Sequence, residues 1–222
     1  MVAPIIEKTA APTALTMTYE EYLQWCDEDV HAEWVDGEVI VFMPAKDEHQ
    51  TIWDFLHRLL GDYVELLGLG KVQSAPFEVK LWRGGPSREP DIFFLKKENL
   101  HRLTSDRLSG PPDLIVEIIS RDSVRRDRDT KFREYAQGGV AEYWIIDSRP
   151  GFHWAAFYRL GEDNQYELVA TEDDERVESS VVSGFWLNPA WLWMVNKPNV
   201  MLTVTRMSPE ATAAFQALQK EE

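Results

Sequence analysis

The sequence contains a single cysteine, Cys26, among its 222 residues. One thiol cannot form an internal disulfide, so the class of small, disulfide-stapled secreted domains is excluded. The sequence also lacks an apolar run near the roughly 20 residues that cross a bilayer, and its start lacks the basic and apolar regions of a signal peptide. We therefore expect a cytoplasmic protein that does not bind a membrane.

Positive charge is scarce as well. The chain has 23 Lys and Arg against 38 Asp and Glu, a net charge of −15. Proteins that coat nucleic acid depend on cations that replace phosphate counterions, so this balance argues against that class. The deficit is uneven, because residues 61–160 hold 16 basic and 15 acidic side chains. Any surface that binds anions is expected in this middle part.

The remaining composition is that of a globular domain. Apolar residues make up 44% of the chain, and nine Trp and ten Phe can fill a sizeable core. We expect an N-terminal tail at 1–16, rich in Ala, Pro and Thr, one domain at 17–200, and a C-terminal helix or tail at 201–222.

Hydrophobic periodicity predicts a mixed α/β fold. Apolar residues at helical spacing indicate an amphipathic helix over 49–67, and the charged segment 121–137 also has a helical pattern. Apolar β-formers predict strands at 77–81, 91–95, 114–119 and 142–147. The order strand, helix, strand over 114–147 is typical of a right-handed parallel crossover.

Turn and capping residues predict the smaller elements. Asp36-Gly37 between β-formers predicts an N-terminal β-hairpin, and the strands near 154–160 and 166–169 form an edge β-hairpin. Thr18 and Glu21 have the spacing of a capping box, and Ser208-Pro209 is typical of the start of a last helix. The predicted fold class is α/β, a mixed β-sheet core flanked by helices.

Two carboxylates in this sheet are the first candidates for chemistry. Glu117 lies inside an apolar strand, where an ionised group needs a cation or hydrogen-bond donors. Asp91 precedes another apolar strand, and the two acids together would suit a hard divalent cation such as Mg²⁺. The alternatives are that Glu117 pairs with an arginine or lies at a sheet edge, and that Asp91 serves only a turn.

The basic candidates lie in the charged segment. Lys131 follows Asp127 by four residues and precedes Tyr135 by four, which places it between the apolar stripe and solvent. It could act beside the acids, or form a surface pair with Asp127 worth a few tenths of a kcal/mol. Residues 121–133 hold six basic and three acidic side chains, and could contact phosphates or form a solvated helix face.

Several motifs recur in the order of a known family. They are Pro44 with His49, Asp127 with Lys131 and Tyr135, and the runs EWVDGE (33–38), EPDI (89–92), PPDLIVEIIS (111–120) and GVAEYWIID (139–147). Over roughly residues 18–170 the chain resembles the Uma-type endonuclease family of the restriction-endonuclease-like, or PD-(D/E)xK, nuclease superfamily.

This resemblance implies a restriction-endonuclease-like core and a DNA endonuclease that hydrolyses phosphodiester bonds with Mg²⁺ or Mn²⁺. Asp91 and Glu117 would bind the metal. In the superfamily a lysine follows the second acid by two residues, but here that residue is Ile119. Lys131 is then the matching catalytic lysine, and Lys80 is a weaker candidate.

The resemblance also assigns supporting roles. The supporting residues would be Glu33, His49, Lys80 and Tyr135. Apart from the resemblance, the basic charge of residues 121–133 points to Arg125, Arg126 and Arg128 as contacts to the nucleic acid. The apolar segments 185–187 and 191–194 could be core or the interface of a homodimer.

Two other readings stay open. A non-catalytic module with the nuclease fold could bind nucleic acid or a protein, a reading that Ile119 and the net charge of −15 favour. A glycosidase-like hydrolase could use Asp91 and Glu117 as an acid/base pair, although no sugar-stacking pattern supports it.

Overall fold

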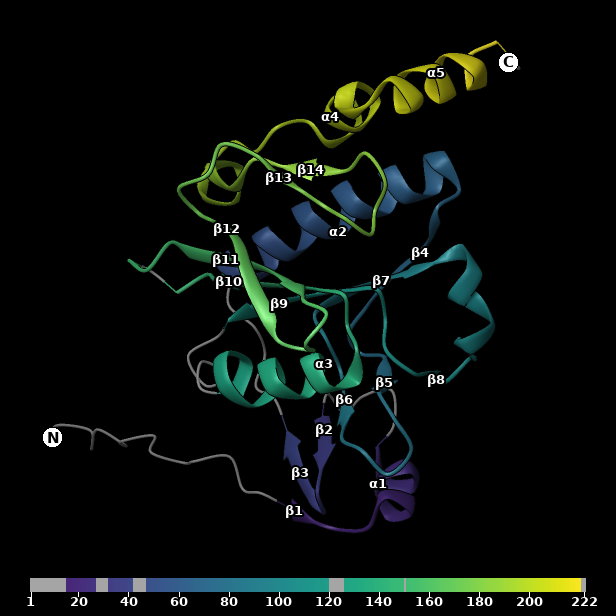
Figure 1. Cartoon of the computed structure of the whole chain (residues 1–222), viewed down its shortest axis with the longest axis vertical. Helices are drawn as coiled ribbons and strands as arrows, with labels where there is room; N and C mark the ends of the chain where they lie inside the picture. Colours follow the sequence, from purple (N-terminus) through teal and green to yellow (C-terminus); the bar gives the residue numbers. More distant parts are fainter. Residues whose placement is uncertain (1–14, 27–31, 42–46, 120–125, 150, 221–222) are drawn as a thin grey trace, which may run out of the picture.

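The computed structural model describes residues 15–26, 32–41, 47–119, 126–149 and 151–220. Within these residues the strands form two six-stranded sheets and one two-stranded ladder. The central sheet has the order β12-β11-β10-β9-β7-β4, and the N-terminal sheet has the order β1-β3-β2-β6-β5-β8. Figure 1 shows β1, β2 and β3 of the N-terminal sheet, with α1, at the opposite end of the molecule from the C-terminal helices.

The elements have the following bounds. The central sheet contains β4 (Gly70–Ser74), β7 (Ile92–Lys96), β9 (Leu114–Ile119), β10 (Glu142–Asp147), β11 (Trp154–Leu160) and β12 (Tyr166–Thr171). The N-terminal sheet contains β1 (Leu15–Thr16), β2 (Ala32–Val35), β3 (Glu38–Val41), β5 (Glu78–Lys80), β6 (Ser87–Arg88) and β8 (Arg107–Ser109). The ladder consists of β13 (Val177–Glu178) and β14 (Trp186–Leu187).

The helices are α1 (Tyr19–Trp25), α2 (Asp47–Leu67), α3 (Phe132–Gly138), α4 (Val200–Met207) and α5 (Pro209–Leu218). Two 3₁₀-helices are η1 (Lys97–Arg102) and η3 (Pro189–Trp193), and η2 (Arg126–Lys131) is a π-helix. No helix among the described residues has both the length and the apolar character needed to cross a membrane.

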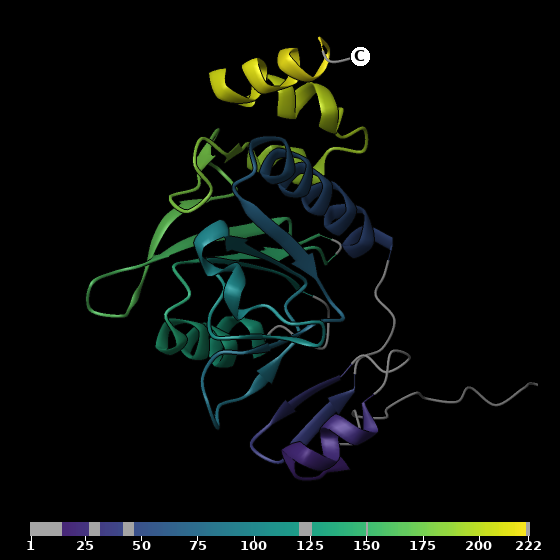
Figure 2. The same ribbon diagram turned by 90° about the vertical axis from the view of Figure 1, so that its right-hand side faces the viewer.

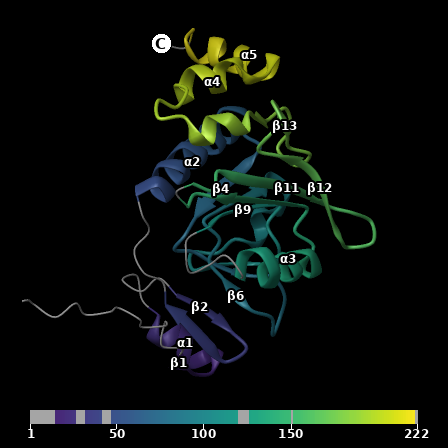
Figure 3. The ribbon, with the colours of Figure 1, turned by 90° about the vertical axis from the view of Figure 1, so that its left-hand side faces the viewer.

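The central sheet contains the predicted parallel crossover. β9 and β10 pair in parallel from Leu114 opposite Glu142 to Ile119 opposite Asp147, and η2 and α3 lie between them in the chain. β7 pairs with β9 antiparallel. β11 and β12 form the predicted edge hairpin, which projects from the body of the molecule in Figures 2 and 3.

Helices cover both faces of the central sheet. α2 lies on one face with α4 and α5 beyond it, and α3 lies on the other face (Figure 1). Along β9, Leu114, Val116 and Ile118 belong to the core cluster that includes α2, whereas Ile115 and Ile119 belong to the cluster that includes α3. Because side chains of a strand alternate between faces, Glu117 is on the α3 side.

The predicted helix over 49–67 is confirmed as α2. Its buried apolar residues recur every three or four positions, as a helix with one buried face requires. They are Ile52, Phe55, Leu56, Leu59, Leu60, Tyr63 and Val64.

The N-terminal hairpin and capping box are confirmed. Asp36 and Gly37 both have positive φ, at 49° and 92°, as a tight hairpin turn between β2 and β3 requires. Thr18 and Glu21 form a reciprocal capping box at the start of α1. The local patterns did not predict that this hairpin joins β6, β5 and β8 in a second sheet, because that pairing links distant segments.

Other expectations differ in detail. Residues 121–125 of the predicted helix over 121–137 lie outside the described residues, and the rest divides mainly into η2 and α3. α4 was not predicted, while α5 begins after Ser208 as expected. The segments at 185–187 and 191–194 mainly fill the core, since their buried residues include Phe185, Leu187 and Leu192. Of the predicted tail, the structure describes Leu15 and Thr16, which pair with β3.

Candidate active site

Glu117 is buried in the middle of β9, with 3% of its surface exposed. Its Oε1 accepts a hydrogen bond of 2.6 Å from the Tyr135 hydroxyl and one of 2.9 Å from Lys131 Nζ. Tyr135 and Lys131 are four residues apart, so they present their side chains on the same side of the crossover segment. The buried carboxylate therefore has both a cation and a neutral donor.

Lys131 lies where three carboxylates meet. Its Nζ is 2.9 Å from Glu33 Oε1, 2.9 Å from Glu117 Oε1 and 3.5 Å from Asp127 Oδ1. Its exposed fraction is 3%, so the expected position at the margin of the core is wrong, and so is the alternative of a surface pair with Asp127. The physical reason is tertiary, because β2 of the other sheet brings Glu33 onto the lysine.

Asp91 is anchored directly to the strand of Glu117. Its Oδ2 accepts a hydrogen bond of 2.7 Å from the backbone N–H of Ile118. The backbone carbonyl of Asp91 accepts a bond of 3.0 Å from Trp53 Nε1 of α2. These contacts place the Asp91 carboxylate beside Glu117, at one end of the antiparallel pair of β7 and β9.

His49 lies next to Asp91 from the first turn of α2. Its Nε2 is 3.6 Å from Asp91 Oδ2, and the residue is 9% exposed. Burial lowers the pKa of His49, but the Asp91 carboxylate raises it, and the net shift is upward. His49 therefore lies where it can support Asp91.

A buried arginine that the sequence analysis missed supports Glu33. Arg88 is 0% exposed and donates to Glu33 Oε2 at 2.9 Å. It also donates to both carboxylate oxygens of Glu134, at 2.7 and 2.8 Å. The sequence feature that could have pointed to Arg88 is its position directly before the EPDI motif at 89–92.

Negative charge dominates around Glu117. Burial raises the pKa of the Glu117 carboxyl, and the Lys131 ammonium opposes that rise. The carboxylates of Asp127, Asp91 and Glu33 add to it, and the pKa lies at about 8. The Glu117 site can therefore take up further positive charge, from a proton or from a cation.

Lys131 is a fixed cation. Burial lowers the pKa of its ammonium, but Glu117, Glu33 and Asp127 raise it above the usual value of a lysine. The group therefore stays protonated at neutral pH and can supply positive charge, but it cannot act as a general base there.

The donor set fits a hard divalent cation. Within the part of the chain that the structure describes, Asp91 Oδ1 and Glu117 Oε2 accept no hydrogen bond. Mg²⁺ prefers oxygen ligands and is commonly held by one or two carboxylates, with water completing its ligands. No group of three or more His, Cys, Asp or Glu side chains in the described residues has the arrangement of a fuller metal cage.

The structure does not bring Lys80 into this cluster. Its Nζ lies 3.6 Å from the centre of the Tyr19 ring and 4.9 Å from that of Trp34, in the N-terminal sheet. Lys131, which contacts Glu117 directly, is thus the lysine of the candidate site.

The predicted nucleic-acid contacts have intramolecular partners where they are described. Arg126 Nε is 3.9 Å from Glu33 Oε2, and Arg128 donates to Asp147 Oδ2 at 3.0 Å. Arg125 lies outside the described residues.

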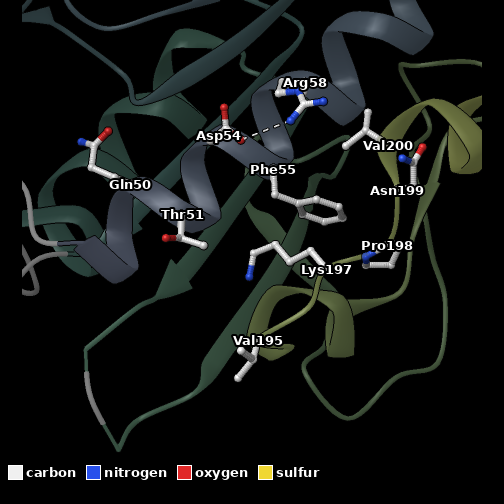
Figure 4. A pocket seen from close by; sticks show the side chains of 10 residues that line it. All are labelled: Gln50, Thr51, Asp54, Phe55, Arg58, Val195, Lys197, Pro198, Asn199 and Val200. Atoms are coloured by element: carbon white, nitrogen blue, oxygen red, sulfur yellow. Dashed lines mark ion pairs between the residues drawn. The ribbon is translucent and has the colours of Figure 1, made fainter.

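A surface cavity of about 480 Å³ lies elsewhere, between α2 and the segment that leads into α4. Figure 4 shows Phe55 and Lys197 between these two elements, with the Asp54–Arg58 ion pair along α2. None of the candidate site residues lines this cavity. The acidic cluster is therefore the better candidate for chemistry.

Comparison with solved structures defines the class of fold. A crystal structure of a putative nuclease belonging to DUF820 from Anabaena variabilis matches with a TM-score of 0.64 and 18% sequence identity. The match covers 81% of this chain and 97% of that chain. The protein thus has an α/β fold that is also found in a nuclease-like protein.

The family follows from the sequence itself. Residues 19–190 match the model of the Uma2 family, which is described as "Putative restriction endonuclease". The chain belongs to this family. A search of curated proteins found no match.

Proposed function

We propose that the protein is a metal-dependent DNA endonuclease that hydrolyses phosphodiester bonds, with Mg²⁺ or Mn²⁺ held by Asp91 and Glu117. Membership of the Uma2 family supports the nuclease class. The single observation that best supports the proposal is the meeting of three distant residues, since Asp91 bonds to the strand of Glu117 and Lys131 bonds to Glu117.

The metal would be held by the two carboxylate oxygens that have no hydrogen-bond partner in the described part of the chain. When bound, it would place positive charge beside the phosphate and lower the pKa of water. Asp91 is held by the Ile118 amide, so its carboxylate is oriented before any ligand arrives. Such orientation is what a reacting site requires.

Lys131 supplies the second positive charge of the proposed site. It takes the place of the lysine that the superfamily has where this chain has Ile119. Its ammonium would stabilise the negative charge that develops on the phosphate. Tyr135 keeps its proton, because burial raises its pKa well above the usual value, and it holds the Glu117 carboxylate in place.

A second candidate function is a non-catalytic module that binds nucleic acid or a protein. The observation that favours it is the saturation of Lys131, whose Nζ already contacts three carboxylates. In this case the cluster would stabilise the fold, and the protein would bind a partner without cutting it.

The test is Asp91→Asn, compared with the parent protein in cleavage of plasmid DNA with Mg²⁺ or Mn²⁺. We expect the parent to cut and the variant to lose more than about 100-fold in rate. Loss of a group that only orients a metal ligand already costs up to about 100-fold, and Asp91 would bind the metal itself. Calorimetric titration with Mn²⁺ should show binding to the parent and none to the variant.

The matched control is Asp62→Asn on the exposed side of α2, which should cut and bind metal like the parent. Lys131→Met should bind Mn²⁺ but not cut, and Lys80→Met should do both. A parent that binds DNA but cuts neither duplex nor single strands with either metal would favour the non-catalytic function.

A further inference from the structure

Four side chains form what we call the arginine–aromatic patch. Arg128 belongs to η2, Arg149 and Phe152 to the segment that follows β10, and Trp154 is the first residue of β11. The Arg128 guanidinium lies 4.0 Å from the centre of the Trp154 ring. The Arg149 guanidinium lies 3.9 Å from the centre of the Phe152 ring. The patch therefore contains two cation–aromatic pairs, whose rings are two residues apart in the chain.

Asp147 anchors both arginines from the end of β10. Its buried carboxylate accepts from Arg128 at 3.0 Å and from Arg149 Nε and Nη2, at 2.8 Å each. One carboxylate thus holds two guanidinium groups, which leaves a local charge of +1 in a protein of net charge −15.

Phe152 presents an open aromatic face. It is 58% exposed although Arg149 stacks on it. Its N–H donates to the Arg149 carbonyl at 3.0 Å, and Gly151 has a φ of +85°, so the backbone here forms a tight turn. Next to it, His153 stacks on Trp193, with ring centres 5.0 Å apart. A backbone hydrogen bond and a ring contact thus lie on either side of the exposed Phe152 ring.

The patch begins at the carboxyl end of β10, which lies beside the carboxyl end of β9, the strand that carries Glu117. Asp147 pairs with Ile119, two residues beyond Glu117 on β9. From the other side, His153 Nε2 is 3.7 Å from Glu48, the neighbour of His49 in α2. A DNA strand bound at Asp91 and Glu117 would therefore pass close to Phe152.

We propose that the arginine–aromatic patch binds an unpaired nucleotide of the DNA, with its base on Phe152 and its phosphate at Arg149 and Arg128. This inference rests on the proposed function. Aromatic side chains stack on bases of any sequence, but a base in an intact duplex is already stacked on its neighbours. The substrate class is therefore DNA with unpaired nucleotides beside the cleaved phosphate, such as an overhang or a loop.

The test measures binding, without metal, of two fluorescent probes: a blunt duplex and the same duplex with a single-stranded overhang. We expect the parent to bind the overhang probe more tightly. Phe152→Ala should weaken that binding by roughly 5- to 150-fold, the range of one base–aromatic stack, and leave blunt binding unchanged. Phe152→Trp should retain it. Arg149→Gln should lower the salt dependence by about one ion.

Matched controls remove similar groups elsewhere. Leu168→Ala deletes an apolar side chain that is 55% exposed on β12. Arg176→Gln removes an arginine that stacks over Trp186 at 4.6 Å beside the β13–β14 ladder. Neither control should change binding of the overhang probe.

The proposal is overturned if the parent binds both probes equally or binds neither, or if Phe152→Ala binds the overhang probe like the parent. Its failure is separable from that of the proposed function. If the parent cuts DNA and Phe152→Ala leaves binding of the overhang probe unchanged, the proposed role of the patch is wrong and the nuclease activity stands. A parent that never cuts, but whose overhang binding requires Phe152, contradicts the nuclease activity alone.

Discussion

Two glutamates contact the same lysine at 2.9 Å, yet the pKa values of their carboxyl groups shift in opposite directions. Burial raises the pKa of Glu33, but Lys131 and then Arg88 lower it to about 2. The pKa of Glu117 lies at about 8, because burial and nearby acids outweigh Lys131. The two further cations at Glu33, Arg88 and Arg126, decide the difference. The structure therefore keeps Glu33 ionised and leaves Glu117 short of positive charge.

The low pKa of Glu33 predicts a loss of stability in acid. An unfolded glutamate has a pKa near 4.5, so between about pH 4.5 and pH 2 the unfolded state binds more protons than the folded state. The contribution of Glu33 is fully present above pH 4.5 and should disappear as the pH falls through about 2. It amounts to about 3 kcal/mol in the free energy of unfolding.

Urea denaturation of the parent and of Glu33→Gln across this pH range measures the effect. The difference in the free energy of unfolding between the two proteins should narrow steadily as the pH falls, since the variant has no ionisable side chain at position 33. The matched control is Glu38→Gln on the exposed side of β3, which should follow the parent at every pH. A constant gap for Glu33→Gln would contradict the proposed pairing.

At the scale of elements, the π-helix η2 decides how the crossover presents its side chains. Asp127 and Lys131 are both buried in it, at 1% and 3% exposure. The Tyr143 hydroxyl of β10 donates to the Asp127 carbonyl at 3.0 Å, which provides a partner for a backbone group in this wider turn. π-Helical turns are rare and are frequent at functional sites. The element is thus a local irregularity that orients Lys131 inward.

Two glycines, one in α2 and one in β4, predict opposite effects of the same substitution. A Cβ at Gly61 would meet nothing within 4 Å, whereas a Cβ at Gly70 would overlap the Leu95 carbonyl oxygen of the paired strand. Gly61→Ala should raise the free energy of unfolding by about 0.5–1 kcal/mol through helix propensity. Gly70→Ala should lower it by about 1–3 kcal/mol through overlap.

Urea denaturation with far-ultraviolet circular dichroism checks this pair, and each variant is the control for the other. Equal effects of the two substitutions would show that the close approach of β4 to β7 does not hold in solution.

At the scale of the whole molecule, the candidate site joins the two sheets. Glu33 and Arg88 belong to β2 and β6 of the N-terminal sheet, while Lys131 and Glu134 belong to the crossover of the central sheet. The Arg88–Glu134 pair, at 2.7 Å, and the Lys131–Glu33 pair, at 2.9 Å, link the sheets, and Arg88 also pairs with Glu33 inside the N-terminal sheet. The cluster therefore forms only when both sheets are folded and in contact.

Removal of the central arginine should uncouple the sheets. Arg88→Met leaves Glu33 and Glu134 without their guanidinium partner, and breaking a buried pair in this way costs about 3–5 kcal/mol. Amide hydrogen exchange should then accelerate most in β2 and β3. The control, Arg58→Met, breaks an exposed pair with Asp54 and should cost under about 1 kcal/mol. Similar losses for both arginines would mean that Arg88 does not join the sheets.

The sequence by itself determined the elements whose patterns are local. The periodicity of α2, the apolar strands β9 and β10, the Asp36-Gly37 turn and the Thr18 capping box were all predictable, because each depends on residues within a few positions of one another. A single carboxylate in an apolar strand also identified Glu117 as a group that needs a partner.

Only the tertiary structure decided which partners meet. The strands divide between two sheets, Lys131 is buried while Lys80 stacks on Tyr19, and Arg88 joins the cluster. None of this follows from local pattern, because a buried charge is placed by contacts between segments distant in the sequence. Where the energy of such contacts exceeds the few tenths of a kcal/mol of a helical surface pair, the long-range contact decides the position of the side chain.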